Sequence, residues 1–126
     1  MCRFVVYMKK LIKSFGYAFR GVAYATRTQL NFRIHMVAMA AAVALGYFLK
    51  ISAMEWLWIA LCIAIVLITE IFNTMIEALT DLVSPGYNEK AGRIKDMSAG
   101  AVVIAAAFAL LTGIVIFLPK LLLLIR

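Results

Sequence analysis

Apolar residues fill most of the chain, and polar residues interrupt them at a few defined places. Residues 9–28 alternate apolar side chains with lysines and arginines at roughly helical spacing. This pattern predicts an amphipathic helix that lies in the headgroup region of a membrane, with packing on the rest of the protein as the alternative. Longer apolar stretches follow at residues 31–49, 56–83 and 97–118. Each is long enough to cross a bilayer as a helix, so we expect an all-α membrane protein with three spans.

The second apolar stretch has clear ends. Trp56 and Trp58 open it, as aromatic residues often do at a membrane–water boundary. Its helical pattern continues past the apolar part to Val83, which predicts a long helix that extends beyond the membrane. A Ser-Pro-Gly sequence then stops the helix, and residues 84–96 are expected to form a polar loop before the third span.

Composition agrees with a membrane protein. The chain is 66% hydrophobic with a mean hydropathy of +1.00, and 126 residues cannot bury that much apolar surface in a water-soluble core. A single membrane domain over residues 1–126 is expected. Cys2 and Cys62 have no metal-ligand spacing. Residues 1–7 are too short an apolar segment for a signal peptide, and Met8 is an alternative first residue.

Basic residues indicate the orientation. The net charge is +7, with seven of the thirteen Lys and Arg residues in residues 1–33 and three in residues 84–96. The positive-inside rule places both segments in the cytoplasm and the C-terminus outside, as three spans require. A basic excess beside spans of this kind points to a membrane surface and not to nucleic acid.

The second half of the second stretch carries a polar stripe on one helix face. At positions i, i+3, i+7 and i+11, with Thr74 close to the same face, stand Glu70, Asn73, Glu77 and Asp81. A carboxylate inside the bilayer costs a few kcal/mol, so a functional role is the first expectation for Glu70. The alternative is an ion pair of Glu70 with Arg33 or Lys95 that only holds helices together.

The stripe suggests two kinds of chemistry. Carboxylate oxygens suit Mg²⁺, and a carboxylate at the membrane boundary could take a proton from an alcohol whose tail lies in the bilayer. Lys95 and Asp96 lie at the same depth at the start of the third span, and a lysine there suits a phosphate. Phosphoryl transfer and cation transport both fit these residues, and spacing does not decide between them.

Several motifs are absent. The chain has neither a phosphate-binding P-loop nor protein-kinase catalytic motifs, which excludes the known soluble kinase folds. His35 is the sole histidine. We expect it to be structural or interfacial, since a metal site would need further ligands.

Two motifs together resemble a known family. Residues 70–81 read EIFNTMIEALTD, and residues 92–102 read GRIKDMSAGAV. They are similar to the signature of the prokaryotic diacylglycerol kinase family, E-x-x-N-[ST]-x-x-E-x-x-x-D followed by Lys-Asp. The match covers nearly the whole chain. It implies a small three-span membrane kinase with a surface helix, assembled as a homotrimeric helical bundle whose active sites are shared between neighbouring subunits.

The resemblance also implies roles for individual residues. Glu70 would be the catalytic base at the lipid hydroxyl, and Glu77 would bind Mg²⁺ and ATP in a site that Asn73 helps to order. Ala99 would lie where the lipid substrate passes. ATP contacts are implied for Lys10, Tyr17, Gln29, Gly86, Tyr87, Asn88, Lys95 and Asp96. The family usually has a second metal-binding Glu where Gln29 stands, so this position could offer Mg²⁺ an amide oxygen without a charge.

The implied reaction is transfer of the γ-phosphate of Mg-ATP to a lipid alcohol in the bacterial inner membrane. The segments NFRIH (residues 31–35) and GIVIFLPKL (residues 113–121) look more like the undecaprenol branch of the family, which favours undecaprenyl phosphate as the product. Diacylglycerol, giving phosphatidic acid, is the alternative acceptor. A small ion transporter or channel subunit and a noncatalytic assembly factor are the other classes that remain open. Little polar lining beyond Thr112 on the first and third spans disfavours transport.

Overall fold

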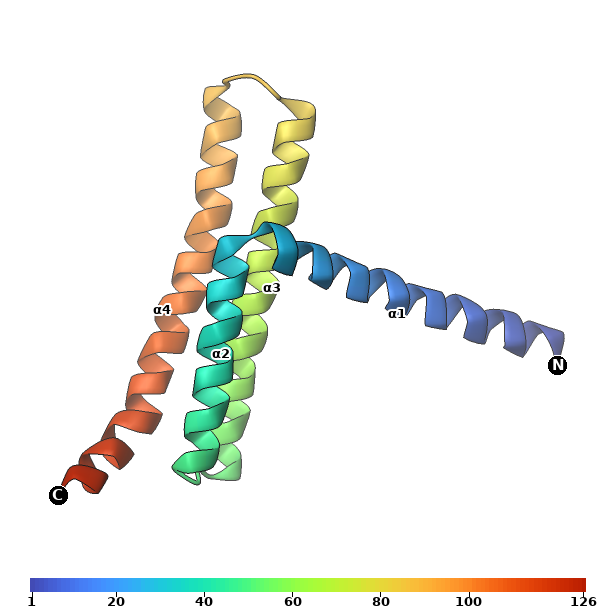
Figure 1. The fold of residues 1–126 in the computed structure, drawn as a ribbon. Helices are drawn as coiled ribbons and strands as arrows, with labels where there is room; N and C mark the ends of the chain where they lie inside the picture. Colours follow the sequence, from blue (N-terminus) through green and yellow to red (C-terminus); the bar gives the residue numbers. More distant parts are fainter.

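The computed structural model describes all residues 1–126 and consists of four α-helices joined by short connections (Figure 1). The helices are α1 (Cys2–Thr28), α2 (Leu30–Phe48), α3 (Ala53–Val83) and α4 (Glu89–Ile125). By length and composition, α2, α3 and α4 could each cross a membrane. The predicted all-α class with three membrane spans is therefore confirmed.

The lengths of the helices determine how the bundle sits in a bilayer. α2 has 19 residues and is about 28 Å long, close to the hydrocarbon thickness of about 30 Å. α3 has 31 residues and is about 46 Å long, so it continues well beyond α2. α3 and α4 run side by side as an antiparallel pair, and their connection lies at the end that projects past α2 (Figure 1). We call this end, with residues 84–88, the loop end.

α1 leaves the bundle at a steep angle, at the level where α2 begins (Figure 1). Gln29 separates the two helices with extended backbone angles, φ −110° and ψ 115°. Ala25 is the only buried residue of α1, whereas apolar side chains such as Phe15 and Phe19 are exposed along the helix. Within one chain only the end of α1 around Ala25 packs on the bundle, and the apolar face along the rest of the helix is free to meet a membrane surface.

Two helices are longer at their ends than predicted. α1 begins at Cys2 and not at residue 9, because residues 3–8 contain no Gly or Pro that would stop a helix. α4 continues through Pro119 to Ile125 and does not end at residue 118. Proline removes one backbone donor and strains the preceding turn, but the apolar residues after it still favour a helix.

α4 also starts earlier than the sequence pattern indicated. Its first residue is Glu89, so the predicted loop over residues 84–96 is wrong beyond Asn88. The side-chain Oδ1 of Asn88 accepts hydrogen bonds from the backbone N–H groups of Lys90 and Ala91, which caps the helix. This first part of α4 is charged, and a charged helix gives no hydropathy signal.

The α2–α3 connection is short and well capped. Lys50 has a left-handed φ of 52°. The backbone N–H groups of Lys50 and Ile51 donate to the carbonyl oxygens of Tyr47 and Gly46 in the last turn of α2, which is a Schellman ending. Ser52 and Glu55 then form a reciprocal capping box at the start of α3. These two motifs fold α3 back against α2.

The best-packed apolar cluster lies beside this connection. Ile51, Ile59, Ile116 and Phe117 are buried together there. Glu55 Oε2 accepts a hydrogen bond from Lys120 Nζ at 2.8 Å, which joins the start of α3 to the end of α4. The end of the bundle opposite the loop end is thus closed by packing and by one ion pair.

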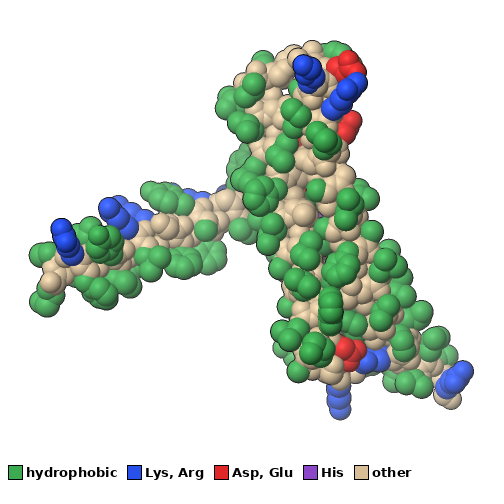
Figure 2. All heavy atoms as spheres, turned by 180° about the vertical axis from the view of Figure 1, so that it is seen from behind, with side chains coloured by type: hydrophobic (Ala, Val, Ile, Leu, Met, Phe, Trp, Pro, Cys, Tyr) green, Lys and Arg blue, Asp and Glu red, His purple; other side chains and the backbone are tan.

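Most of the apolar surface remains open in a single chain. Only 16 of the 126 residues are buried. On the face in Figure 2, charged side chains gather at the two ends of the bundle and along α1, and the band between them is apolar. Lipid or further protein chains must cover a band of this kind.

Gly46→Ala is expected to lower the free energy of unfolding by about 1–3 kcal/mol through overpacking. The added Cβ would lie 2.7 Å from Cη2 of Trp56 and 3.1 Å from Cδ1 of Ile51. Gly113→Ala is the matched control, because its nearest such atom is 3.9 Å away. Unfolding by SDS in mixed micelles measures the difference, and equal midpoints for the two variants would contradict this packing.

Candidate active site

The predicted polar stripe lies on α3, and its burial decreases along the helix. Glu70 is 2% exposed and Asn73 8% exposed, whereas Glu77 is half-buried and Asp81 is exposed. The stripe therefore starts inside the bundle and ends in water at the loop end. Such a gradient suits a reaction between one reactant in the bilayer and another in solution.

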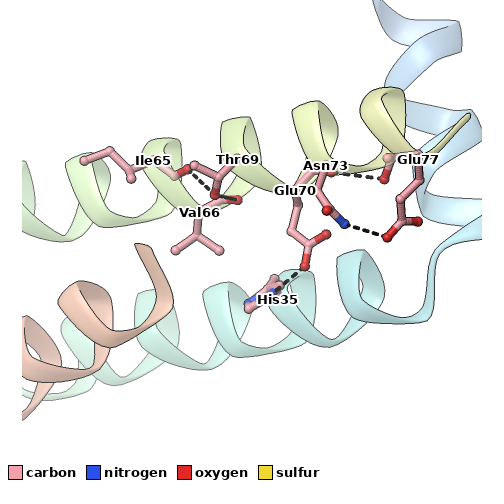
Figure 3. A network of polar contacts seen from close by, with 8 residues as sticks. His35, Ile65, Val66, Thr69, Glu70, Asn73 and Glu77 are labelled. Atoms are coloured by element: carbon pink, nitrogen blue, oxygen red, sulfur yellow. Dashed lines mark hydrogen bonds and ion pairs between the residues drawn. The ribbon is translucent and has the colours of Figure 1, made fainter. Parts of the chain in front are cut away.

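Glu70 contacts a single ionisable side chain, which is His35. The Nε2 atom of His35 lies 3.2 Å from Oε1 of Glu70 (Figure 3). Arg33 is exposed and forms no ion pair, and Lys95 pairs with Asp81. The alternative pairing of Glu70 with Arg33 or Lys95 is therefore wrong. No spacing rule could have linked His35 to Glu70, because the two residues lie on different helices.

A second polar network joins α3 to α4. Asn73 Nδ2 donates to Oε1 of Glu77 at 3.3 Å (Figure 3). On its other side, Asn73 Oδ1 lies 2.7 Å from the hydroxyl of Ser98, which also reaches the carbonyl oxygen of Lys95 at 2.8 Å. Ser98 is not among the residues that the two motifs assign to the site, and the structure adds it. Glu77 has no cationic partner.

A polar pocket of about 290 Å³ occupies the loop end between α3 and α4. The structure brings into it four residues that the resemblance assigned to ATP: Gly86, Tyr87, Asn88 and Lys95. Asp81 lines the same pocket and forms an ion pair with Lys95 Nζ. Both side chains are partly exposed, so this pair contributes little to stability and can open.

A small apolar groove of about 80 Å³ lies between α2 and α3, beside His35. His35 is its one polar residue, and the rest of its lining is Ala38, Met39, Ile63, Val66 and Leu67. These α3 residues precede Glu70 by one to two turns. The groove therefore runs along the membrane-spanning part of the bundle and ends beside the Glu70–His35 contact.

The other predicted site residues line neither pocket and form none of these hydrogen bonds within one chain. Lys10 and Tyr17 are exposed on α1, which points away from the bundle (Figure 1). Gln29 is half-buried at the α1–α2 break, and its side chain makes no hydrogen bond. Asp96 is exposed without an ion pair, and Ala99 is exposed on α4.

One chain contains no group of three His, Cys, Asp or Glu side chains that could hold a metal. Mg²⁺ in nucleotide enzymes, however, takes only one or two protein carboxylates and completes its shell with phosphate oxygens and water. Glu77 offers such a carboxylate, because it is free of cations and Asn73 orients it. The donor set therefore fits Mg²⁺ that arrives with nucleotide phosphates.

The fold and the site define a multi-pass helical membrane protein that combines a buried carboxylate with a polar pocket on the water side. A model of the prokaryotic diacylglycerol kinase family matches residues 16–117. The undecaprenol kinase of Bacillus subtilis strain 168 is 37% identical over 114 residues, which cover 90% of this chain and 93% of that protein. The diacylglycerol kinase of Synechocystis sp. is 42% identical over 113 residues, covering 89% and 65%. The diacylglycerol kinase of Escherichia coli K12 is 35% identical over 103 residues, covering 82% and 84%.

The chain belongs to the prokaryotic diacylglycerol kinase family, as its two motifs predicted. It is a multi-pass membrane enzyme, a lipid kinase that uses ATP as the phosphate donor. The enzyme interpretation is thus confirmed over the transporter and assembly-factor alternatives.

Ser98→Ala is expected to lower the free energy of unfolding by about 1–3 kcal/mol, because Asn73 Oδ1 would lose its buried donor. Thr112→Ala is the control, since that hydroxyl donates only to the Phe108 carbonyl within its own helix. Both variants can be compared by thermal unfolding in detergent. If Ser98→Ala costs no more than Thr112→Ala, the inter-helix bond does not stabilise the fold.

Proposed function

We propose that the protein transfers the γ-phosphate of ATP to the hydroxyl of undecaprenol and produces undecaprenyl phosphate. The observation that carries the reaction is the buried carboxylate of Glu70 at the end of an apolar groove. The likeness to an undecaprenol kinase over 93% of that relative, together with the segments NFRIH and GIVIFLPKL, favours this acceptor. Diacylglycerol is the runner-up, because other relatives are diacylglycerol kinases.

At the lipid end, Glu70 acts as the catalytic base. The apolar groove beside it takes the first part of the lipid tail, which brings the hydroxyl to the carboxylate, and Ala99 lies along the path of the lipid. As the lipid oxygen bonds to the γ-phosphorus, its proton passes to Glu70 and the bond from that phosphorus to ADP breaks. Low exposure of Glu70 limits competition from water as the acceptor.

At the water end, the pocket between α3 and α4 holds ATP. Lys95 exchanges its partner Asp81 for a phosphate oxygen, and Asp96 and the loop residues Gly86 to Asn88 flank the nucleotide. Glu77, oriented by Asn73, would hold Mg²⁺, with the amide oxygen of Gln29 as a second ligand. Mg²⁺ held there would neutralise charge on the phosphates.

We also propose a homotrimer with shared sites. α1 carries Lys10 and Tyr17 away from the pocket of its own chain (Figure 1). These residues can therefore contribute to ATP binding only in a neighbouring copy, and the open apolar band of the bundle offers surface for that contact. The distribution of Lys and Arg supports a place in the bacterial inner membrane with α1 and the loop end in the cytoplasm.

The test is transfer of labelled phosphate from Mg-ATP to undecaprenol and diacylglycerol, assayed in parallel with the purified protein. Undecaprenol should be the better acceptor, and a preference for diacylglycerol would overturn the choice of substrate. Glu70→Gln should lower kcat by about 10²–10⁴-fold, because the amide cannot accept the proton. Glu55→Gln makes the same change at the opposite end of the bundle and should keep its activity per folded protein. If kcat of Glu70→Gln equals that of the native protein, Glu70 is not the catalytic base.

Gln29→Glu is expected to lower the Mg²⁺ concentration for half-maximal activity several-fold, because a second carboxylate adds charge to the metal site. Gln29→Leu removes the oxygen and should raise that concentration. Activity of both variants is measured over a Mg²⁺ titration at saturating ATP. Titration curves that coincide with the native curve would show that residue 29 does not meet the metal.

A further inference from the structure

His35 is the only ionisable group within ion-pair distance of Glu70. From α4, the hydroxyl of Ser98 donates to Oδ1 of Asn73 and not to the Glu70 carboxylate. On α3 itself, the hydroxyl of Thr74 donates to the backbone carbonyl of Glu70. α1 contributes only Ala25 to the buried residues. Among polar side chains, only His35 contacts the Glu70 carboxylate.

The contact involves one carboxylate oxygen. Nε2 of His35 lies 3.2 Å from Oε1, and no hydrogen bond of the structure engages Oε2 (Figure 3). His35 also forms the polar end of the groove between α2 and α3. The second oxygen of Glu70 lies on the side of Asn73 in Figure 3, so a lipid hydroxyl would have to pass the end of the groove to reach it.

We propose that His35 is a positioning residue for phosphoryl transfer, which holds Oε1 of Glu70 so that Oε2 faces the lipid hydroxyl. This inference rests on the proposed role of Glu70 as the base. During the reaction the hydroxyl proton passes to Oε2 as the new oxygen–phosphorus bond forms and ADP leaves. His35 keeps its own protons and stays on Oε1 throughout.

A restraint of this kind matters because the Glu side chain is flexible. It has three rotatable bonds, and a base must stay within hydrogen-bond reach of the proton that it removes. Misplacement by about 1 Å can cost about 10²-fold in rate. Asn73 and Ser98 satisfy each other, and neither is bonded to the Glu70 carboxylate. Replacing His35 would thus remove the polar contact of the Glu70 carboxylate and leave Glu70 itself in place.

The competing explanation is that His35 only joins α2 to α3. A purely structural contact would affect folding, and its loss would lower the amount of folded protein without changing turnover per folded molecule. A positioning contact would lower kcat and leave the ATP site, at the loop end, unchanged. The two explanations therefore differ in measurable parameters.

The experiment compares His35→Ala with His35→Gln in the full-length protein, with undecaprenol and Mg-ATP as substrates. Glutamine keeps an N–H donor at similar reach, so it should retain most of kcat, whereas alanine should lose about 10–100-fold. KM for ATP should change little in either variant. Val43→Ala, half-buried on the same helix and outside the groove, should keep native kcat. Unfolding midpoints in SDS and mixed micelles are measured for all three variants.

The double variant His35→Ala/Glu70→Gln completes a cycle. If His35 acts through Glu70, removing it from Glu70→Gln should cost almost nothing further. If His35→Ala lowers kcat as strongly in the Glu70→Gln protein as in the native protein, the inference is overturned. A His35→Gln variant with the same kcat as His35→Ala would also overturn it. Equal kcat per folded molecule in His35→Ala and the native protein would assign His35 to structure alone. Full activity of Glu70→Gln by itself would instead reject the base, and with it both proposals.

Discussion

The arrangement of the helices around the site depends on the free-energy cost of burying a carboxylate at the membrane boundary. Glu70 is 2% exposed and lies between two membrane-spanning helices, where an unpaired charge would cost several kcal/mol. Its contact with His35 offsets part of that cost and brings α2 against α3 at the level of the site. Only one carboxylate oxygen is used for this purpose. The same contact thus leaves the second carboxylate oxygen without an ion-pair partner.

The unequal lengths of the helices bring a lipid reactant and a soluble reactant together. α2 matches the bilayer, whereas α3 and α4 continue past it and carry the polar pocket. A regular helix places residues one, two and three turns apart on one face, so a single stripe can run from Glu70 through Glu77 to the loop end. The stripe therefore links the interior of the bundle to the polar pocket without a change of helix.

Much of this could be predicted from the pattern of the chain, and the failures have physical causes. Apolar stretches revealed three spans because lipid demands long runs of apolar residues. The start of α4 was missed because a charged helix capped by Asn88 has no hydropathy signal. The roles of Ser98 and His35 in the site were missed because each depends on a partner from another helix. In the sequence Ser98 stands among small residues that favour close helix packing, and its acceptor Asn73 is known only from the structure.

The sequence by itself determined the class of protein, the number of spans, the polar stripe and the family. These properties are local, since they depend on helical periodicity, on composition and on two motifs within single segments. Tertiary structure decided which side chains meet. It paired Glu70 with His35 and Lys95 with Asp81, and it carried Lys10 and Tyr17 away from the pocket of their own chain. The reason is that periodicity specifies the face of a helix on which a residue lies, whereas the packing of helices specifies what that face meets.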